Sequence, residues 1–184
     1  RDAQIQKDSM RFRKNLERIG EISAYEISKD LDYQSLTTNT PLGVSQTNVP
    51  KDNLVLATIL RAGLPLHTGL LNYFDHAENC FISAYRKHSS ANDFEVEIEY
   101  LASPNIQGKV VLLSDTMLAS GQSMVLAYNA LLKRGTPAKV HIVSVIGSQQ
   151  GIDLVSENFP ENSTLWIGEV DPKMTTQSYI VPGL

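Results

Sequence analysis

The chain has 184 residues, of which 42% are hydrophobic and 20% are charged, so it is long enough to bury one full-sized core. Its formal net charge of −4 argues against a broad basic surface, and therefore against nucleic-acid binding as its main role. The single cysteine, Cys80, excludes an internal disulfide framework and any multi-cysteine metal site, and it favours a cytoplasmic protein.

The first fifty residues predict a helix and a hairpin. Residues 2–31 carry apolar side chains at three- and four-residue steps, and we expect Gly20 and Ser23 to interrupt this helix. We interpret its cluster of arginines and lysines as a solvated face rather than an anion contact. Residues 36–49 are rich in threonine and predict an edge hairpin, for which a lid and a dimer contact both stay open.

The rest of the chain predicts an α/β fold with a doubly wound, mostly parallel sheet of about five strands flanked by helices. Residues 95–101 alternate acidic and apolar side chains, which predicts an exposed antiparallel β-hairpin arm. We expect a single domain over 1–184, with a core at about 51–184. The expected strands cover residues 54–60, 79–85, 110–114, 139–146 and 163–169.

The stretch from 109 to 124 organises the chain. A buried strand ends at Asp115, a loop of small residues follows, and a helical pattern begins near Met124. Ligands of open α/β sheets bind beyond the carboxyl ends of the strands, and helix N-termini attract anions. The loop at 120–123 therefore predicts a cradle for one phosphate group. An ordinary loop capped by Ser120 or Ser123 is an equally good interpretation of these residues alone.

Two arginines also follow predicted strands. Arg61 and Gly63 come directly after residues 54–60, where a planar guanidinium can bind pyrophosphate and glycine allows a close backbone approach. Arg86 follows residues 79–85, and the polar segment after it, residues 87–94, is expected to be mobile and to close over the site.

Five segments, in this order, resemble the uracil phosphoribosyltransferase family. The resemblance runs from about residue 10 to the last residue and is specific in combination. The segments are Ile59-Leu-Arg-Ala-Gly63, Tyr85-Arg86, Asp115-Thr-Met-Leu-Ala-Ser-Gly-Gln-Ser123, Leu132-Lys-Arg-Gly135 and Tyr179-Ile-Val-Pro-Gly-Leu184.

The resemblance implies a type I phosphoribosyltransferase fold that transfers ribose 5-phosphate from phosphoribosyl pyrophosphate to uracil, giving UMP and pyrophosphate. Asp115 would bind the ribose hydroxyls, and Arg61 with Arg86 would bind pyrophosphate. Tyr179 and the main chain of Ile180 would contact uracil. The phosphoribosyl pyrophosphate site would consist of Asp115, Thr116, Met117, Leu118, Ala119, Ser120, Gly121, Gln122 and Ser123.

The resemblance further implies Mg²⁺ held mainly through pyrophosphate and water, with no protein metal ligand. It implies a homodimer or higher homo-oligomer and a GTP effector. No apolar run approaches membrane-spanning length, so we expect no membrane partner. The alternative hypothesis is a non-catalytic or regulatory protein on the same fold that binds nucleotides or pyrimidine-gene RNA, which the acidic composition argues against.

The chain departs from the family pattern in three ways. Thr116, Ser120 and Gln122 stand where the family has Pro, Thr and Gly, and the bulk of Gln122 is expected to weaken or reshape the phosphate pocket. Lys87 and His88 follow Arg86, where acidic residues are usual. The family continues after Tyr-Ile-Val-Pro-Gly-Leu with Gly-Asp-Ala-Gly-Asp, so we expect a C-terminal tail to be missing.

Overall fold

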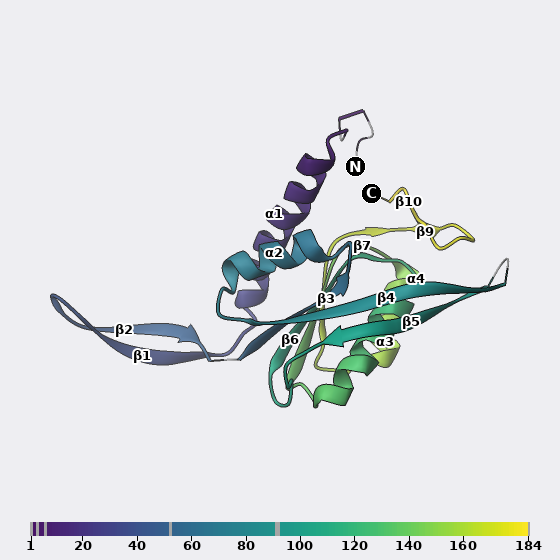
Figure 1. Cartoon of the computed structure of the whole chain (residues 1–184). Coiled ribbons are helices and arrows are strands. Elements are labelled where there is room, and N and C mark those ends of the chain that lie inside the picture. Colours follow the sequence, from purple (N-terminus) through teal and green to yellow (C-terminus); the bar gives the residue numbers. More distant parts are fainter. Residues whose placement is uncertain (1, 3, 6, 52, 91–92, 184) are drawn as a thin grey trace.

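The computed structural model describes residues 2, 4, 5, 7–51, 53–90 and 93–183, with side chains other than those of residues 85–97 (Figure 1). Its centre is a six-stranded sheet in the order β5-β4-β3-β6-β7-β8. Neighbouring strands are parallel except β5, which pairs antiparallel with β4 at one edge. The strands are β3 (Leu54–Leu60), β4 (Glu78–Ser90), β5 (Asp93–Ala102), β6 (Val110–Leu118), β7 (Lys139–Ser148) and β8 (Thr164–Asp171).

Helices cover both faces of this sheet, as the doubly wound pattern predicts (Figure 1). On one face, α1 (Ser9–Ser28) and α2 (Leu64–Tyr73) pack their buried leucines and isoleucines against β3, β6 and β7. On the other face, α3 (Gln122–Leu131) and α4 (Gln149–Asn158) pack against the same central strands. Because both faces are covered, β3 and β7 are buried along almost their whole length, and most of their residues are apolar. A 3₁₀ turn, η1 (Leu132–Arg134), follows α3.

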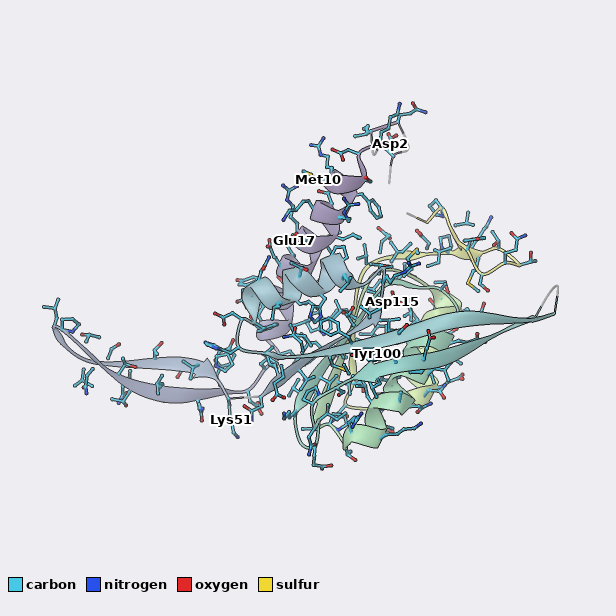
Figure 2. The ribbon with its side chains drawn as sticks, in the orientation of Figure 1. Asp2, Met10, Glu17, Lys51, Tyr100 and Asp115 are labelled. Atoms are coloured by element: carbon cyan, nitrogen blue, oxygen red, sulfur yellow. The ribbon has the colours of Figure 1, made fainter. Side chains whose placement is uncertain are left out.

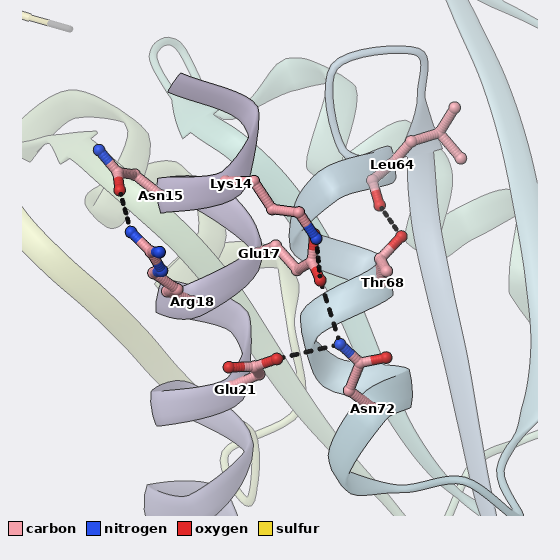
Figure 3. A network of polar contacts seen from close by, with 8 residues as sticks. All are labelled: Lys14, Asn15, Glu17, Arg18, Glu21, Leu64, Thr68 and Asn72. Carbon is pink, nitrogen blue, oxygen red and sulfur yellow. Dashed lines mark hydrogen bonds and ion pairs between the residues drawn. The ribbon is translucent and has the colours of Figure 1, made fainter. Parts of the chain in front are cut away.

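The two helices of the first face approach closely. A Cβ atom added at Gly20 of α1 would lie 2.4 Å from the carbonyl oxygen of Leu66 in α2, so only glycine fits at this crossing. Beside the crossing, Asn72 of α2 donates to Glu21 at 3.0 Å and to Glu17 at 3.3 Å (Figure 3). The expectation that Gly20 and Ser23 interrupt the helix is therefore wrong: α1 is continuous, and Gly20 serves its packing.

The predicted hairpin forms β1 (Tyr33–Thr40) and β2 (Gly43–Pro50), which pair with each other and extend away from the rest of the chain (Figure 1). Every residue of the pair is exposed except Val49, which is half-buried. Tyr33 donates its hydroxyl hydrogen to the carbonyl oxygen of Ser28 at 3.0 Å, which links the base of the hairpin to the end of α1.

Several predicted boundaries are wrong. The strand expected at residues 110–114 continues past Asp115 to Leu118, because its backbone stays paired with β7. The strand expected to end at Tyr85 continues to Ser90, because its backbone pairs with β5 along the whole arm. Residues 91 and 92, at the turn of the expected mobile segment, lie outside the described residues, as do the side chains of residues 87–94. The region after β8 contains β9 (Lys173–Met174), which pairs with β10 (Ile180–Val181).

Within the described part of the chain, no helix has both the length and the apolar character that crossing a membrane requires.

Candidate active site

A cavity of about 360 Å³ lies beyond the carboxyl ends of β3 and β6, where the parallel-sheet argument predicts a ligand site. Three segments that are distant in sequence surround it: the end of β3, the loop between β6 and α3, and the β9–β10 segment. Its lining residues are Ile59, Leu60, Ala62, Ala84, Asp115, Thr116, Met117, Leu118, Ala119, Ser120, Gly121, Ser123, Met124, Ser178, Tyr179 and Ile180.

Asp115 is the acidic residue of this lining. It lies near the end of β6, at the edge of the sheet nearest to the C-terminal segment (Figure 2). Burial raises the pKa of its carboxyl group to about 7, and hydrogen bonds from the backbone N–H groups of Thr116 and Met117 oppose this rise. The Thr116 N–H lies 2.7 Å from Oδ1. The carboxylate is thus held by its own backbone, as an acceptor facing the cavity.

The loop between β6 and α3 packs directly on the first turn of α4. Ser148, the N-cap of α4, donates its hydroxyl hydrogen to the carbonyl oxygen of Ala119 at 2.6 Å and accepts the Gly151 N–H at 3.0 Å. The C=O and the N–H of a trans peptide point in opposite directions. Because the Ala119 carbonyl faces α4, the N–H of Ser120 faces away from α4. The turn therefore presents a backbone donor on the side opposite the helix that supports it.

Gly121 completes this turn in a left-handed conformation, with φ of +80°. A Cβ atom at this position would lie 2.9 Å from the carbonyl oxygen of Gly151. Both the backbone angle and the packing against α4 therefore require glycine. Directly after it, α3 begins, and its first N–H groups have no partner within the helix. Hydroxyls of Ser120 and Ser123, backbone donors and a helix N-terminus meet here, which is the chemistry that binds a phosphate group.

The third side of the cavity comes from the β9–β10 segment. Thr175 holds the loop within it: its N–H donates to the carbonyl oxygen of Tyr179 at 2.8 Å, and its hydroxyl accepts the Tyr179 N–H at 3.1 Å. Ser178 has a positive φ of 62° and lines the cavity next to Tyr179 and Ile180. Ile180 is 8% exposed and packs into the α1–α2 side of the core.

The structure brings most of the predicted site residues together, but not all. Ten predicted positions line the cavity: Asp115 to Gly121, Ser123, Tyr179 and Ile180. Gln122 does not line it, and its side chain is exposed on the first turn of α3. The expectation that its bulk reshapes the pocket is not supported by this position.

The two predicted arginines have different outcomes. Arg61 is exposed and lies outside the lining, although its neighbours Leu60 and Ala62 belong to it. Its turn folds tightly back on β3, since a Cβ atom added at Gly63 would lie 2.2 Å from Oγ1 of Thr58. The side chain of Arg86 lies outside the described residues, and its backbone belongs to β4.

Three other lining residues were not predicted as site residues from the sequence. Ala84 and Met124 line the cavity only because β4 and α3 meet beside it, and Ser178 does so through an unusual backbone angle. A pattern of apolar and polar residues cannot reveal such positions.

The fold is that of a phosphoribosyltransferase. A hypoxanthine phosphoribosyltransferase from Staphylococcus aureus superposes with a TM-score of 0.59 at 16% identity, over 92% of this chain and 84% of that one. A solved structure of the AQ2163 protein from Aquifex aeolicus has a TM-score of 0.89 at 30% identity, over 97% of this chain and 84% of that one.

The sequence comparison defines the family more narrowly. The profile of the family described as "Uracil phosphoribosyltransferase" matches residues 1–184. A uracil phosphoribosyltransferase of Porphyromonas gingivalis is 55% identical over the whole chain, which spans 85% of that protein. The chain belongs to the uracil phosphoribosyltransferase family.

Proposed function

We propose that this protein transfers the 5-phosphoribosyl group from phosphoribosyl pyrophosphate to uracil, forming UMP and pyrophosphate in pyrimidine salvage. One observation carries the proposal beside the family membership. The turn at residues 119–123 (the phosphate-type turn), the Asp115 carboxylate and the β9–β10 segment face one cavity. A phosphorylated sugar and a base therefore fit next to each other.

The turn after β6 suits the 5-phosphate. Backbone N–H groups and hydroxyls between Ala119 and Ser123, together with the N-terminus of α3, supply donors without any charged side chain. Asp115 lies a few residues before this turn and suits the ribose hydroxyls, which donate to a carboxylate. The ionised form of Asp115 is the better acceptor, so we expect sugar binding to be stronger above its pKa of about 7 than below it.

Pyrophosphate needs positive charge. We assign this role to Arg61 and Arg86, because a guanidinium matches two phosphate oxygens at once. Arg61 is exposed beside the cavity, where it can turn toward a leaving group without breaking an ion pair to any described residue.

The residues present also fit Mg²⁺ that arrives with its substrate. Among the described residues, no group of three or more His, Cys, Asp or Glu side chains could hold a metal ion. Mg²⁺ keeps several waters and commonly binds through one or two carboxylates plus substrate phosphates. When bound, Mg²⁺ would neutralise pyrophosphate charge, with Asp115 as the nearby carboxylate.

No side-chain nucleophile is required for this transfer. The bond between the anomeric carbon and pyrophosphate breaks with its electron pair going to pyrophosphate, and uracil N1 gives up its proton to water and bonds to that carbon. The protein holds the two substrates in line and stabilises the separated charges. We propose that Tyr179 and the main chain of Ile180 orient uracil for this attack.

The test is pyrophosphate release by the purified protein with phosphoribosyl pyrophosphate, Mg²⁺ and one base at a time. We expect turnover with uracil and none with hypoxanthine. Turnover with another base would contradict the choice of uracil. If none of the bases supports turnover and the protein binds pyrimidine-gene RNA in a salt-dependent manner, the regulatory alternative is favoured.

We further propose that the protein forms a homodimer or a larger homo-oligomer through β1 and β2. An isolated two-stranded hairpin is at best marginally stable in water. This hairpin nevertheless exposes Leu36, Leu42 and Val44 at 47%, 101% and 71%. A second copy of the chain would cover them. We also propose that GTP regulates the protein, as the family resemblance implies. We propose a cytoplasmic location, since the buried free thiol of Cys80 suits a reducing compartment.

A further inference from the structure

The last residue of β8 carries a carboxylate that the proposed chemistry does not use. Asp171 is 3% exposed, and its Oδ2 accepts the backbone N–H of Gly183 at 3.0 Å. We propose that Asp171 is a positioning residue for the base. By holding Gly183, it fixes the main chain of Ile180 at the cavity. This inference rests on the proposed function, in which Ile180 contacts uracil.

The hydrogen bond closes the base of the segment that lines the cavity. Asp171 lies two residues before β9, and Gly183 lies two residues after β10, so their contact joins the two ends of the segment. Between these ends, only two residues of each strand pair, Ile180 with Met174 and Val181 with Lys173. So short a ladder gives little stability by itself.

Gly183 transmits this restraint to Ile180. Its φ is +74°, and a Cβ atom at Gly183 would lie 2.5 Å from the carbonyl oxygen of Ile180. The two backbones therefore touch, and a shift of Gly183 moves the Ile180 peptide. Thr175 fixes the loop at the other end of the segment through its hydrogen bonds with Tyr179.

The position of Asp171 is itself rigid. Asp171 pairs with Ser148, the last matched pair between β7 and β8. Ser148 in turn bonds to Ala119 in the phosphate-type turn. The carboxyl end of the sheet thus supports both halves of the cavity. Ser148 supports the turn assigned to the 5-phosphate, and Asp171 supports the β9–β10 segment assigned to the base. A buried carboxylate requires hydrogen bonds, which a backbone N–H supplies without competing for substrate.

The test is the steady-state kinetics of Asp171→Ala and Asp171→Asn, with phosphoribosyl pyrophosphate and uracil varied separately. Loss of a hydrogen bond to a charged acceptor corresponds to a change of about tenfold to a hundredfold. We expect Asp171→Ala to raise KM for uracil by about that factor, with KM for phosphoribosyl pyrophosphate changed less than about threefold. Asp171→Asn keeps an oxygen acceptor at the same place and should restore most of the uracil affinity.

The matched control is Glu169→Ala, an exposed acid two residues earlier on β8, which should change neither KM. Gly183→Ala displaces the same turn from its other side, so it should reproduce the uracil-selective defect even if Asp171→Ala does not fold. An unchanged KM for uracil in Asp171→Ala, or an equal rise in both KM values, would overturn the inference, as would a normal KM for uracil in Gly183→Ala.

A wrong substrate assignment and a wrong role for Asp171 give distinguishable results. If the wild-type protein uses another base in place of uracil, the substrate is wrong, and the same variants measured with that base still test Asp171. If the wild type uses uracil and the Asp171 variants match it, only the positioning role fails.

Discussion

Replacing Asp115 by asparagine tests the electrostatics of the site without any substrate. Burial raises the pKa of this carboxyl group from 3.8 to about 7 in the folded protein. The pKa of Asp115 is higher in the folded than in the unfolded protein, so its ionisation does not lower the free energy of unfolding below about pH 4. As the pH rises from about 4 toward 7, the free energy of unfolding decreases, because the carboxyl group ionises more readily in the unfolded chain. Above the folded pKa, this loss stays constant.

The magnitude follows from the two pKa values. One pKa unit corresponds to about 1.4 kcal/mol, so the loss is about 2 kcal/mol at pH 5 and about 4 kcal/mol at pH 8.5. Asparagine has the shape of aspartate, keeps an acceptor for the Thr116 N–H and does not ionise. Asp115→Asn should therefore be more stable than the wild type, and its advantage should grow by about 2–3 kcal/mol between these pH values.

The assay is denaturant unfolding of both proteins at the two pH values, without phosphate. In a thermal scan, the growth of the advantage corresponds to about 5–10 °C in Tm. Glu157→Gln, at an exposed position of α4, is the control and should show no such change. A difference between wild type and Asp115→Asn that is the same at both pH values would refute the reasoning. The more stable variant should be the poorer enzyme, with kcat/KM for phosphoribosyl pyrophosphate reduced about tenfold or more.

Three further predictions concern the phosphate-type turn and the hairpin. Gly121→Ala should lower stability by about 1–3 kcal/mol and raise KM for phosphoribosyl pyrophosphate, because φ is +80° there and Gly151 blocks a Cβ; a normal KM would contradict the role of this turn. Gln122→Gly should leave that KM within about twofold and cost up to about 1 kcal/mol of helix stability, since the Gln122 side chain is exposed; a large gain of activity would show that Gln122 does obstruct the site. Leu36→Ser combined with Val44→Ser should weaken self-association by at least about tenfold in sedimentation velocity, and a wild type that is monomeric at micromolar concentration would refute an interface on the hairpin.

Local patterns were sufficient to predict the buried strands and part of the lining of the cavity. Continuous apolar runs such as Leu54–Leu60 predict buried parallel strands, because a strand covered by helices on both faces must be apolar on both sides. The carboxyl end of such a strand is where its loop meets a ligand, so Asp115 and the turn after it were predicted as a site from spacing alone. The family resemblance added Tyr179 and Ile180, which also line the cavity.

Packing between distant segments decided the rest. Gly20 looks like a helix breaker in the sequence, but it is the contact point of α1 with α2, and only the partner helix makes this visible. The length of β4 depends on its pairing with β5, and the exposure of Gln122 depends on the direction in which α3 leaves the turn.

The sequence by itself therefore determined which strands are buried, which loop is predicted to bind a phosphate group and which family the motifs resemble, since each depends on neighbours within a few residues. Only the tertiary structure decided which side chains meet. The contacts of Ser148 with Ala119 and of Asp171 with Gly183 join segments that no local pattern connects. They form because the parallel strands place their carboxyl ends side by side, which fixes the two halves of the cavity relative to each other.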